Sequence, residues 1–429
     1  MIFKLYLSAT GYITKALIIG GGVAGPTAAM ALARVGIESE VFERDHQGAD
    51  QRGAWISLQA NGIDALRSID ADGPLAGVGY PMDTISFVNG KGRPLGRMPM
   101  AARRPDGLTS LMMPRSALYS ALADEARARG VRVRNGARFV DATVDDDGVT
   151  AEFADGTRAR GDILIGADGI HSTVRALIDP GARSPRYVPV LNIGGHVPGL
   201  AVEGEPRDFR MQFGTRCFFA WMPTPDGGTV WFANPPSRTE PERGVLSGID
   251  DAQWRRRLHA LMDGDAGPSG AIIDAAPGPL FGWATYDLPV VEHWHDGRGR
   301  MVLIGDAAHA TSPAAGQGAA MSLEDAVILA QCLRDRPTTA EAFGTFEILR
   351  RERTEKIVAA GHRASNSKAA GPVARLFRDL MLPFVFRRAA KDGGRSMMWL
   401  QGHHIDFDEP VPSAPDSAPA RLGGGRQRG

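Results

Sequence analysis

A glycine-rich loop near the start of the chain could bind a pyrophosphate group. It runs Gly-Gly-Gly-Val-Ala-Gly from Gly20 to Gly25, a G-x-G-x-x-G pattern in which Gly22 is the second glycine. In such a pattern the first glycine permits a tight turn, the second lets a pyrophosphate approach the backbone, and the third lets the following helix pack against the strand. The backbone N–H groups at Val23 and Ala24 would face the phosphates from the positive end of that helix.

An acidic residue follows where a dinucleotide-binding fold needs one. Residues 15–19 read as a buried strand, residues 23–35 as a helix, and residues 37–43 as a second strand that ends at Glu43. A carboxylate there can accept hydrogen bonds from both ribose hydroxyls and would repel a 2′-phosphate. Together these features predict a parallel β-α-β unit that binds a dinucleotide, without separating FAD from NAD. We interpret Arg44 as a solvent-exposed residue or a neighbour of the adenine.

A second glycine loop opens a helix near the far end of the chain. Residues 301–305 read as another buried strand, directly followed by Asp306. Its carboxylate suits a further sugar or ribityl hydroxyl, and the alternative is an N-cap of the next helix. The loop that follows contains Pro313, Gly316, Gly318 and Ala319. Because it leads into a helix that extends to about residue 333, it is a second candidate anion site.

A third motif, Asp168-Gly169, follows the buried strand at residues 162–166. Ser172 could cap the helix that comes next. Taken alone, this motif is a strand-to-helix turn.

The three motifs together resemble the group A flavoprotein monooxygenases, the para-hydroxybenzoate hydroxylase-like family, over roughly residues 15–365. That family has a G-x-G-x-x-G, an Asp-Gly and a Gly-Asp motif in this order. The resemblance implies that Gly20, Gly22, Gly25 and Glu43 hold the adenosine half of FAD. It also implies that Asp306 holds the ribityl chain, that Asp168 lies near the pyrophosphate, and that the Gly316–Ala319 loop lies near the flavin pyrimidine edge.

Two arginines match family positions that contact FAD, namely Arg52 and Arg115, with surface charge as the alternative for each. At Ala320 the family often has Asn or Cys, so this chain lacks a side-chain contact to the flavin there. His309 follows the family's Gly-Asp-Ala-Ala-His pattern, and we interpret it as part of the cofactor loop rather than as a catalytic base.

The resemblance also implies the chemistry. Non-covalent FAD would be reduced by NADH or NADPH and would react with O2, and a flavin C4a-hydroperoxide would transfer one oxygen atom to an aromatic or polycyclic small molecule. Only one dinucleotide unit is evident, so the pyridine nucleotide would bind transiently. The flavin would carry the reaction, so no catalytic side chain and no metal is predicted. A reductase or dehydrogenase on the same scaffold is the alternative function, and a flavoprotein that only binds is a third.

The elements that position these motifs predict an α/β fold. A Rossmann-type FAD-binding domain (β-α-β, mixed sheet) would be interleaved with an antiparallel β-sheet substrate domain and followed by C-terminal helices. The predicted segments are an N-terminal extension at 1–13, FAD-binding parts at 14–83, 109–184 and 291–345, substrate-domain parts at 84–108 and 185–290, C-terminal helices at 346–407 and a disordered tail at 408–429. Residues 131–134, 137–144 and 148–153 read as a small antiparallel meander.

Aromatic side chains are frequent between residues 185 and 235. Those that could line a substrate cavity, or equally the core of the sheet, are Phe213, Phe218, Trp221 and Trp231. The basic residues that follow residue 345 are interpreted as a solvated helix face, with a membrane or partner contact as the alternative; they include Arg350, Arg351, Arg353 and Arg375.

The balance of charge limits the classes of partner that the protein could bind. The 429 residues include 49 acidic and 49 basic side chains, so no long-range attraction to nucleic acid is expected. No run of about 18 apolar residues exists, so no membrane span is predicted. Two cysteines cannot supply a disulfide framework. We therefore expect a cytoplasmic monomer or homodimer whose partners are O2 and a small, aromatic substrate.

Overall fold

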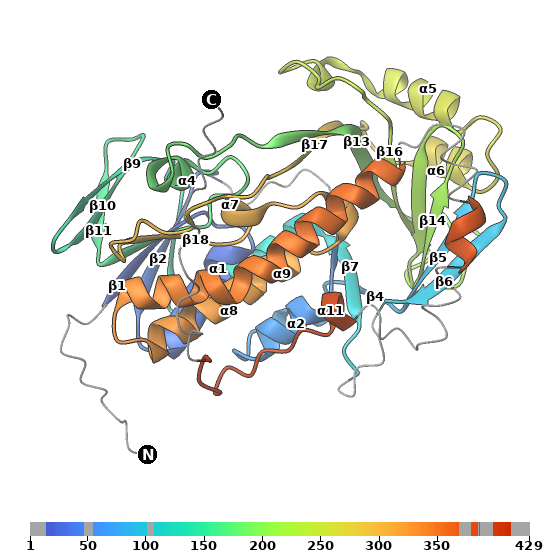
Figure 1. Cartoon of the computed structure of the whole chain (residues 1–429). Helices are drawn as coiled ribbons and strands as arrows, with labels where there is room; N and C mark the ends of the chain where they lie inside the picture. Colours follow the sequence, from blue (N-terminus) through green and yellow to red (C-terminus); the bar gives the residue numbers. More distant parts are fainter. Residues whose placement is uncertain are drawn as a thin grey trace, which may run out of the picture.

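The computed structural model describes residues 14–46, 55–100, 107–368, 379–384, 386 and 398–412. They form two halves that lie side by side (Figure 1). One half is built on a parallel sheet and the other on a larger sheet that is mostly antiparallel. The long helix α9 (Thr339–Lys368) runs diagonally across both. The predicted α/β fold with an interleaved second sheet is confirmed, while the predicted N-terminal extension lies outside the described residues.

A five-stranded parallel sheet organises the first half. Its order is β18-β12-β1-β2-β8. The strands are β1 (Lys15–Ile19), β2 (Glu38–Glu43), β8 (Arg132–Asn135), β12 (Ile163–Gly166) and β18 (Met301–Leu303). Residues 16–19 are at most 3% exposed, as expected for a parallel sheet that is covered on both faces. The carboxyl ends of β1, β2, β12 and β18 lie at one edge, which therefore collects the three motifs.

The prediction for residues 131–134 was wrong. The sequence placed them in an antiparallel meander, but β8 pairs in parallel with β2. The helix α3 (Arg115–Ala128) precedes β8 and packs on α1 (Ala24–Arg34), which brings β8 to the edge of the parallel sheet. The meander consists instead of β9 (Phe139–Asp145), β10 (Gly148–Phe153) and β11 (Arg158–Gly161), and the short helix α4 (Thr173–Ile178) follows β12.

The second half contains a seven-stranded sheet of order β17-β13-β16-β15-β14-β5-β6. Its strands are β5 (Thr84–Asn89), β6 (Pro94–Pro99), β13 (Arg186–Val197), β14 (Asp208–Phe213), β15 (Phe218–Pro223), β16 (Thr229–Asn234) and β17 (Gly282–Asp287). All neighbours are antiparallel except β14 and β5, which are parallel. This exception arises because β5 and β14 enter the sheet from segments more than a hundred residues apart. One face is covered by α5 (Asp251–Met262) and α6 (Ser269–Ala275).

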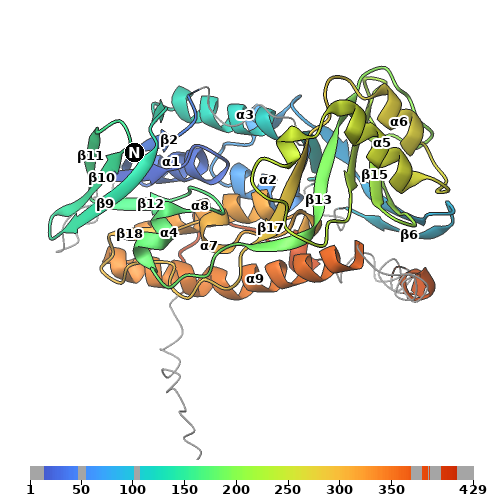
Figure 2. The ribbon, with the colours of Figure 1, turned by 90° about the horizontal axis from the view of Figure 1, so that it is seen from above.

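A small three-stranded sheet joins the halves. It contains β3 (Trp55–Leu58), β4 (Tyr80–Met82) and β7 (Ser110–Pro114), in the order β3-β7-β4. The remaining elements are α2 (Ala60–Arg67), α7 (Asp306–His309), α8 (Gly318–Asp335), α11 (Met398–Gln401) and the 3-10 turns η1 (Gly73–Leu75), η2 (Leu246–Gly248) and η3 (Pro313–Ala315). Seen from above, α3 and α9 lie on opposite sides of the first half (Figure 2).

A buried ionic network joins α8 to α9. Arg350 is 0% exposed, and its guanidinium lies 2.7 Å from both Glu324 and Asp325. Arg353 lies 2.8 Å from Glu324. The prediction of a solvated basic face was therefore wrong for these two arginines, because each faces a carboxylate of α8. Arg351 is half-buried between Glu347 and Glu355 of its own helix, and Arg375 lies outside the described residues.

The segment at 398–412 packs on the first half. Leu400 O accepts a hydrogen bond of 2.9 Å from Arg353, His404 lies 2.9 Å from Asp64, and the N–H of Val411 donates to Asp335 at 2.8 Å. The predicted disordered tail was thus placed too early, because residues 408–412 have partners on α8. Residues 413–429 lie outside the described part.

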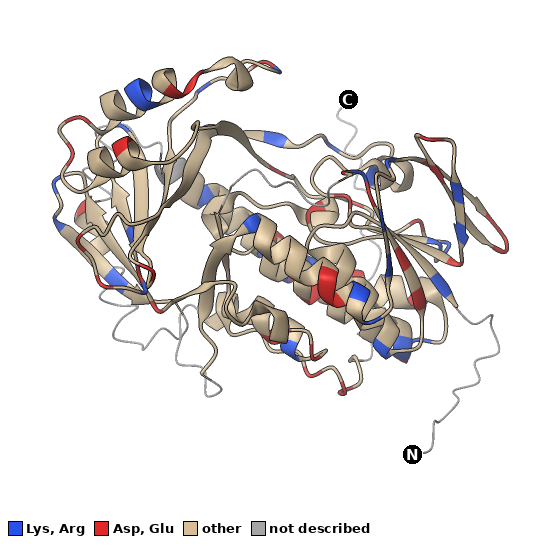
Figure 3. Cartoon of the chain, turned by 180° about the vertical axis from the view of Figure 1, so that it is seen from behind, with Lys and Arg blue, Asp and Glu red and all other residues tan. Residues whose placement is uncertain are grey.

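Charges of both signs are interspersed along the two halves (Figure 3). Within the described part of the chain, no helix combines the length and apolar character that a membrane span requires.

Candidate functional site

The glycines of the first loop divide into two structural classes. Gly20 has φ +112°, and a Cβ there would lie 2.2 Å from Ala167 O. A Cβ at Gly25 would lie 1.9 Å from Gly20 O. In contrast, the nearest atom to a Cβ at Gly22 is 3.9 Å away, in the ring of Tyr119. Gly20 and Gly25 are therefore fixed by packing, whereas Gly22 faces open space that a ligand could fill.

The N-terminus of α1 adds an anion site to this loop. Val23 is its N-cap without a side-chain hydrogen bond, Ala24 begins the helix, and the first turn contains no acidic residue. The free N–H groups and the positive end of the helix dipole are thus available to a phosphate.

Glu43 lies beside this loop and is only 9% exposed. Its two carboxylate oxygens accept hydrogen bonds from the N–H groups of Gly21, at 2.7 Å, and Asp45, at 3.0 Å. A carboxylate has about four acceptor positions, so two remain for ribose hydroxyls. Arg44 is exposed at the end of β2.

Asp306 begins α7 immediately after β18. The N-cap of α7 is Gly305, and the Asp306 carboxylate accepts no hydrogen bond from any described residue, which excludes the alternative of an N-cap. Burial raises the pKa of the Asp306 carboxyl, whereas His309 and Arg115 act in the opposite direction. A half-buried acid without a partner is costly unless a ligand supplies donors, as a ribityl chain would.

The second glycine loop provides another uncapped helix end. Pro313 begins η3, and Gly316 ends it with φ +63°. Helix α8 then begins at Gly318, with no side-chain cap at Gln317 and no acid in its first turn. The N–H groups of Gly318 and Ala319 are therefore positioned to face a ligand.

Ala320 is the position where the family often carries Asn or Cys. It is 1% exposed, and a Cβ at Gly62 of α2 would lie 2.9 Å from Ala320 Cβ. The small side chain therefore matches the close packing of α2 on α8.

Arg115 and Tyr119 connect the two loops. Arg115 Nε donates to the Tyr119 hydroxyl at 2.5 Å, and the guanidinium lies 5.0 Å from the centre of the tyrosine ring. Burial raises the pKa of Tyr119, and the charges of Asp306 and Glu43 add to that rise. Tyr119 thus lies within electrostatic range of both carboxylates. Arg52, the other predicted arginine, lies outside the described residues.

These contacts define a continuous lane. It starts at Glu43, passes Gly22, Tyr119 and Arg115, reaches Asp306, and continues to Gly318, where a Cβ would lie 3.8 Å from Asp306 Oδ1. It ends at Gly316, where a Cβ would lie 3.7 Å from Ser57 Oγ of β3 and 3.6 Å from Nε2 of Gln59, the N-cap of α2. Along these residues the lane contains a ribose-type acid, a pyrophosphate-type loop, a ribityl-type acid and a second anion site.

Asp168 stabilises a turn that packs against the first glycine loop. Its carboxylate accepts hydrogen bonds from Ser172 Oγ at 2.5 Å and from the N–H groups of Thr173 and Val174. Ser172 in turn caps α4, as predicted. Burial raises the pKa of Asp168 despite these bonds. Because Ala167 contacts Gly20, the Asp168 turn fixes the glycine loop.

His309 belongs to the same scaffold. It is 4% exposed, and its Nε2 lies 2.5 Å from Asp325 Oδ2, which also accepts the N–H of Gly305 at 2.8 Å. Burial would raise the pKa of Asp325, but His309 and Arg350 hold it below its usual range. His309 therefore helps to position the turn at Asp306, in line with its interpretation as part of the cofactor loop.

The predicted substrate aromatics separate onto two faces of the seven-stranded sheet. Trp221 and Trp231 pack with Trp254 under α5, so they belong to the core on the outer face. Phe218 packs with Met82 and Met112 of the small sheet, and Phe213 lies partly buried against the same cluster. We call this side the inner face; its buried residues on the seven-stranded sheet are Phe209, Phe218, Ala220, Met222 and Val230.

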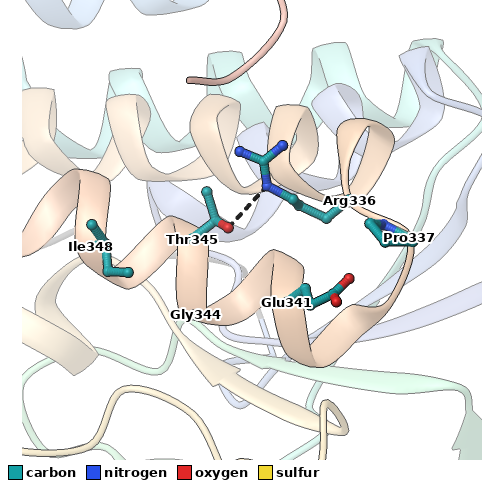
Figure 4. A pocket seen from close by; sticks show the side chains of 6 residues that line it. All are labelled: Arg336, Pro337, Glu341, Gly344, Thr345 and Ile348. Atoms are coloured by element: carbon teal, nitrogen blue, oxygen red, sulfur yellow. Dashed lines mark hydrogen bonds between the residues drawn. The ribbon is translucent and has the colours of Figure 1, made fainter. Parts of the chain in front are cut away.

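A separate hollow of about 440 Å³ lies at the start of α9 (Figure 4). It is lined by Arg336, Pro337, Glu341, Gly344, Thr345 and Ile348. Arg336 donates to Thr345 Oγ1 at 3.0 Å, so the polar groups there partly satisfy each other. None of these residues belongs to the lane, and we assign the hollow no part in cofactor binding.

Three lane residues were not predicted from the sequence, namely Tyr119, Ser57 and Gln59. Tyr119 stands four residues after Arg115, a spacing that puts both on one helix face, so it could have been inferred. Ser57 and Gln59 carried no motif and became evident only from their contact with Gly316.

The lane fits FAD on structural grounds. Gly22 leaves open the space that a Cβ would fill, the acid at Asp306 has no partner, and two helix ends lack caps. Each of these features is matched by one part of FAD: pyrophosphate, ribityl hydroxyls and the polar edge of the ring.

Replacing Glu43 or Asp306 with alanine should weaken FAD retention. Each change removes a charged acceptor, and bonds to charged groups contribute roughly 1.5–3 kcal/mol, or about 10- to 150-fold in affinity. Flavin fluorescence titration of the apoprotein measures the effect, with the exposed Glu205→Ala as control. Unchanged affinity in both variants would contradict the assigned roles.

The affinity for FAD should depend on the ionisation of Asp306. Because the pKa of Asp306 is raised and FAD hydroxyls favour its ionised form, affinity should fall as the pH drops through that raised value. Asp306→Asn should lack this step.

Comparisons with known proteins identify the family of this chain. The sequence model of the family described as "FAD binding domain" matches residues 13–359. The aurachin C monooxygenase/isomerase of Stigmatella aurantiaca is 32% identical over 81% of this chain and 88% of its own. The 3-amino-4-hydroxybenzoate 2-monooxygenase of Streptomyces cremeus is 31% identical over 79% and 84%. The structure of Klebsiella pneumoniae HpxO with FAD and uric acid superposes with a TM-score of 0.78 at 25% identity, covering 89% of this chain and 95% of that one. The chain therefore belongs to the FAD binding domain family and is an FAD-dependent monooxygenase of the group A type.

Proposed function

We propose that this enzyme uses NAD(P)H and O2 to hydroxylate, or epoxidise, a small aromatic or polycyclic molecule. The observation that carries the proposal is the position where the lane ends. Gly316 lies beside Ser57 of the small sheet and beside Gln59, the N-cap of α2, and the small sheet also presents Met82 and Met112 to the inner face. The reactive end of the cofactor would therefore meet an apolar, aromatic-rich environment. Relatives whose names specify an aminohydroxybenzoate and a neighbour with uric acid support an aromatic substrate.

The bound flavin supplies the hydride-accepting and oxygen-activating chemistry. The chain supplies position and electrostatics. N–H groups at Gly318 and Ala319, at the N-terminus of the 18-residue helix α8, would stabilise negative charge at the ring edge. Side chains of the inner face exclude water around the reacting carbon, which protects reactive oxygen species from loss to solvent.

We propose a matching division of labour along the chain. Residues 14–83, 109–184 and 291–345 would hold FAD, and residues 84–108 and 185–290 would hold the substrate. The placement of Glu43, Asp168 and Asp306 in the first set, and of Phe213 and Phe218 in the second, supports this division. We further propose that the protein is a cytoplasmic monomer or homodimer; size-exclusion chromatography with light scattering would test its oligomeric state, and cell fractionation its location.

Oxygen incorporation tests the reaction class. Turnover of an aromatic panel under ¹⁸O2, read by mass spectrometry, should give products heavier by one labelled atom. Products that lack the label, formed with full consumption of NAD(P)H, would favour a reductase and reject the proposal.

A true substrate should also accelerate NAD(P)H consumption at least about tenfold, which needs about 1.4 kcal/mol of differential binding between two cofactor arrangements. A Cβ built at Gly316 would lie no closer than 3.6–3.7 Å to Gln59 and Ser57, so no side chain clamps this glycine and the loop can tolerate such rearrangement. Stopped-flow reduction at equal rates with and without a verified substrate would contradict this control.

A further inference from the structure

Trp55 forms an aromatic wall next to the flavin end of the lane. Alternate residues of a strand point to the same face, so Trp55 shares a face of β3 with Ser57, and a Cβ at Gly316 would lie 3.7 Å from Ser57 Oγ. In the register of the small sheet, Ser57 is opposite Met112, and Met112 is opposite Tyr80. Trp55, Ser57 and Tyr80 therefore lie on the same side of the small sheet, the side that faces the inner face of the seven-stranded sheet. Trp55 is two residues before Ser57 in β3, and Ser57 is the residue beside the cofactor loop.

The ring of Trp55 packs against two aromatic side chains but is not enclosed by them. It lies 5.8 Å from Tyr80 at an interplanar angle of 8°, and 5.3 Å from His196. Tyr80 and His196 are only 6.5 Å apart, so they do not sandwich Trp55. Its indole N–H is accessible and makes no hydrogen bond to any described residue. This leaves ring surface and a donor available to a flat ligand.

His196 is oriented by a chain of hydrogen bonds. Thr224 Oγ1 donates to Asp226 Oδ1 at 2.5 Å, so its single hydrogen is used. The contact of 3.3 Å between His196 Nε2 and Thr224 Oγ1 must then be donated by the histidine. Because a neutral imidazole carries one N–H, Nδ1 is left as an acceptor. No described residue occupies Nδ1.

The surrounding groups keep this arrangement in place. Asp226 also accepts from the Tyr80 hydroxyl at 2.7 Å and from the N–H of Gly228 at 3.2 Å. The pKa of Asp226 is lowered to about 2 by its bonds from Thr224 and Tyr80, so it stays an anion. A Cβ at Gly228 would lie 2.4 Å from His196 Nε2, so only glycine leaves room for the imidazole.

We propose that His196 is a catalytic base that accepts a proton through Nδ1 from a hydroxyl or ring N–H of an aromatic substrate stacked on Trp55. This inference rests on the proposed function and deepens it, because it restricts the substrate to rings that bear an ionisable hydroxyl or N–H. The substrate O–H or N–H bond breaks as the Nδ1–H bond forms, and the ring keeps the electron pair. The resulting electron-rich anion is the form that accepts an electrophilic oxygen atom most readily.

The charge on the protonated imidazole has a counterion. Asp226 lies 3.9 Å from Nε2 and acts through Thr224. Tyr80, on β4, is the other titratable group that the structure places against His196, and its pKa is raised to about 12 by burial and by Asp226, so it stays neutral. The side chain of His196 is 20% exposed, so the proton can pass on to solvent.

Binding of 4-nitrophenol to the holoenzyme tests this base without turnover. The yellow phenolate band reports ionisation, and 4-nitroanisole, which lacks the proton, reports stacking alone. The parent enzyme should bind both probes and raise the phenolate fraction of the first. His196→Gln should lower the ratio of bound phenolate to phenol about tenfold, which corresponds to one pKa unit of the probe, while affinity for 4-nitroanisole stays unchanged. Trp55→Ala should weaken both probes.

Two further variants complete the test. Thr224→Val should lower the phenolate ratio as His196→Gln does, because it releases the imidazole. His259→Gln, an exposed histidine paired with Asp274 on α6, should change nothing. Equal phenolate ratios in the parent, His196→Gln and Thr224→Val, or a parent that binds neither probe, would overturn the proposal. Normal probe ionisation without incorporation of ¹⁸O would reject the proposed function alone.

Discussion

Replacing Arg350 with methionine is expected to lower the free energy of unfolding by about 3–5 kcal/mol, the usual cost of removing one partner from a buried ion pair. Arg350 is 0% exposed and lies 2.7 Å from both Glu324 and Asp325, which are equally buried. Methionine matches the length of the side chain but leaves the two carboxylates with Arg353 and His309 as their main counterions. Because Asp325 also holds the N–H of Gly305, the damage should reach the turn at Asp306 and weaken FAD retention as well.

The effect should depend on pH in a defined direction. Burial would raise the pKa of Glu324, but Arg350 and Arg353 hold it below its usual range. A depressed carboxyl pKa contributes stability that is present above the unfolded-state value and is lost as the pH falls through the folded-state value. Without Arg350 the folded-state values rise, so the variant should lose stability at a higher pH than the parent during acidification.

Thermal unfolding of the holoenzyme at several pH values measures both effects. Arg127→Met is the control, because Arg127 is 41% exposed and forms an i,i+3 pair with Asp124, an arrangement that contributes little. Arg350→Lys should be intermediate, since one ammonium group cannot bridge two carboxylates as a guanidinium does. Equal midpoints for the Arg350→Met and Arg127→Met variants would show that the network does not support the fold.

The sequence could not reveal this network. Arg350 and Arg353 stand among many polar residues, and a charged side chain is usually exposed. Their burial depends on partners 25 to 29 residues earlier in the chain, and no local pattern reports which faces of two helices meet. The β-α-β unit was predictable for the opposite reason. Its strand, glycine loop, helix and terminal acid at Glu43 are all local, and each constrains the next.

The residues on the substrate side show a second limit of prediction from the sequence. Phe218 and Trp221 of β15 are both sequence-based candidates for the substrate cavity, although residues three apart on a strand point to opposite faces, and no local pattern reports which face meets the small sheet. That choice depends on α5 and α6, which follow β16 in the chain and cover Trp221 and Trp231. His196 and Trp55 carried no motif at all, since their geometry arises only when β3, β4 and the turn at Asp226 come together.

Alanine at Gly25 and alanine at Gly22 should have opposite consequences, although both lie in one loop. A Cβ at Gly25 would lie 1.9 Å from Gly20 O, a backbone atom that can move only if α1 separates from β1. Overpacking of a tight interior costs roughly 1–3 kcal/mol and more where backbone must shift. Gly25→Ala should therefore destabilise the apoprotein itself and lower the yield of folded enzyme.

Gly22→Ala should leave the apoprotein intact, because the nearest atom to the added Cβ is 3.9 Å away in Tyr119. The methyl group would instead occupy the space through which a pyrophosphate reaches the backbone. FAD affinity should fall at least about tenfold, a loss of about 1.4 kcal/mol, while the unfolding midpoint of the apoprotein stays at the parental value. Thermal unfolding monitored by circular dichroism and flavin fluorescence titration separate the two quantities. If Gly22→Ala retained FAD as the parent does, the pyrophosphate would have to lie elsewhere along the lane. If it instead unfolded like Gly25→Ala, the open space beside Tyr119 would be part of the packing rather than of the cofactor site.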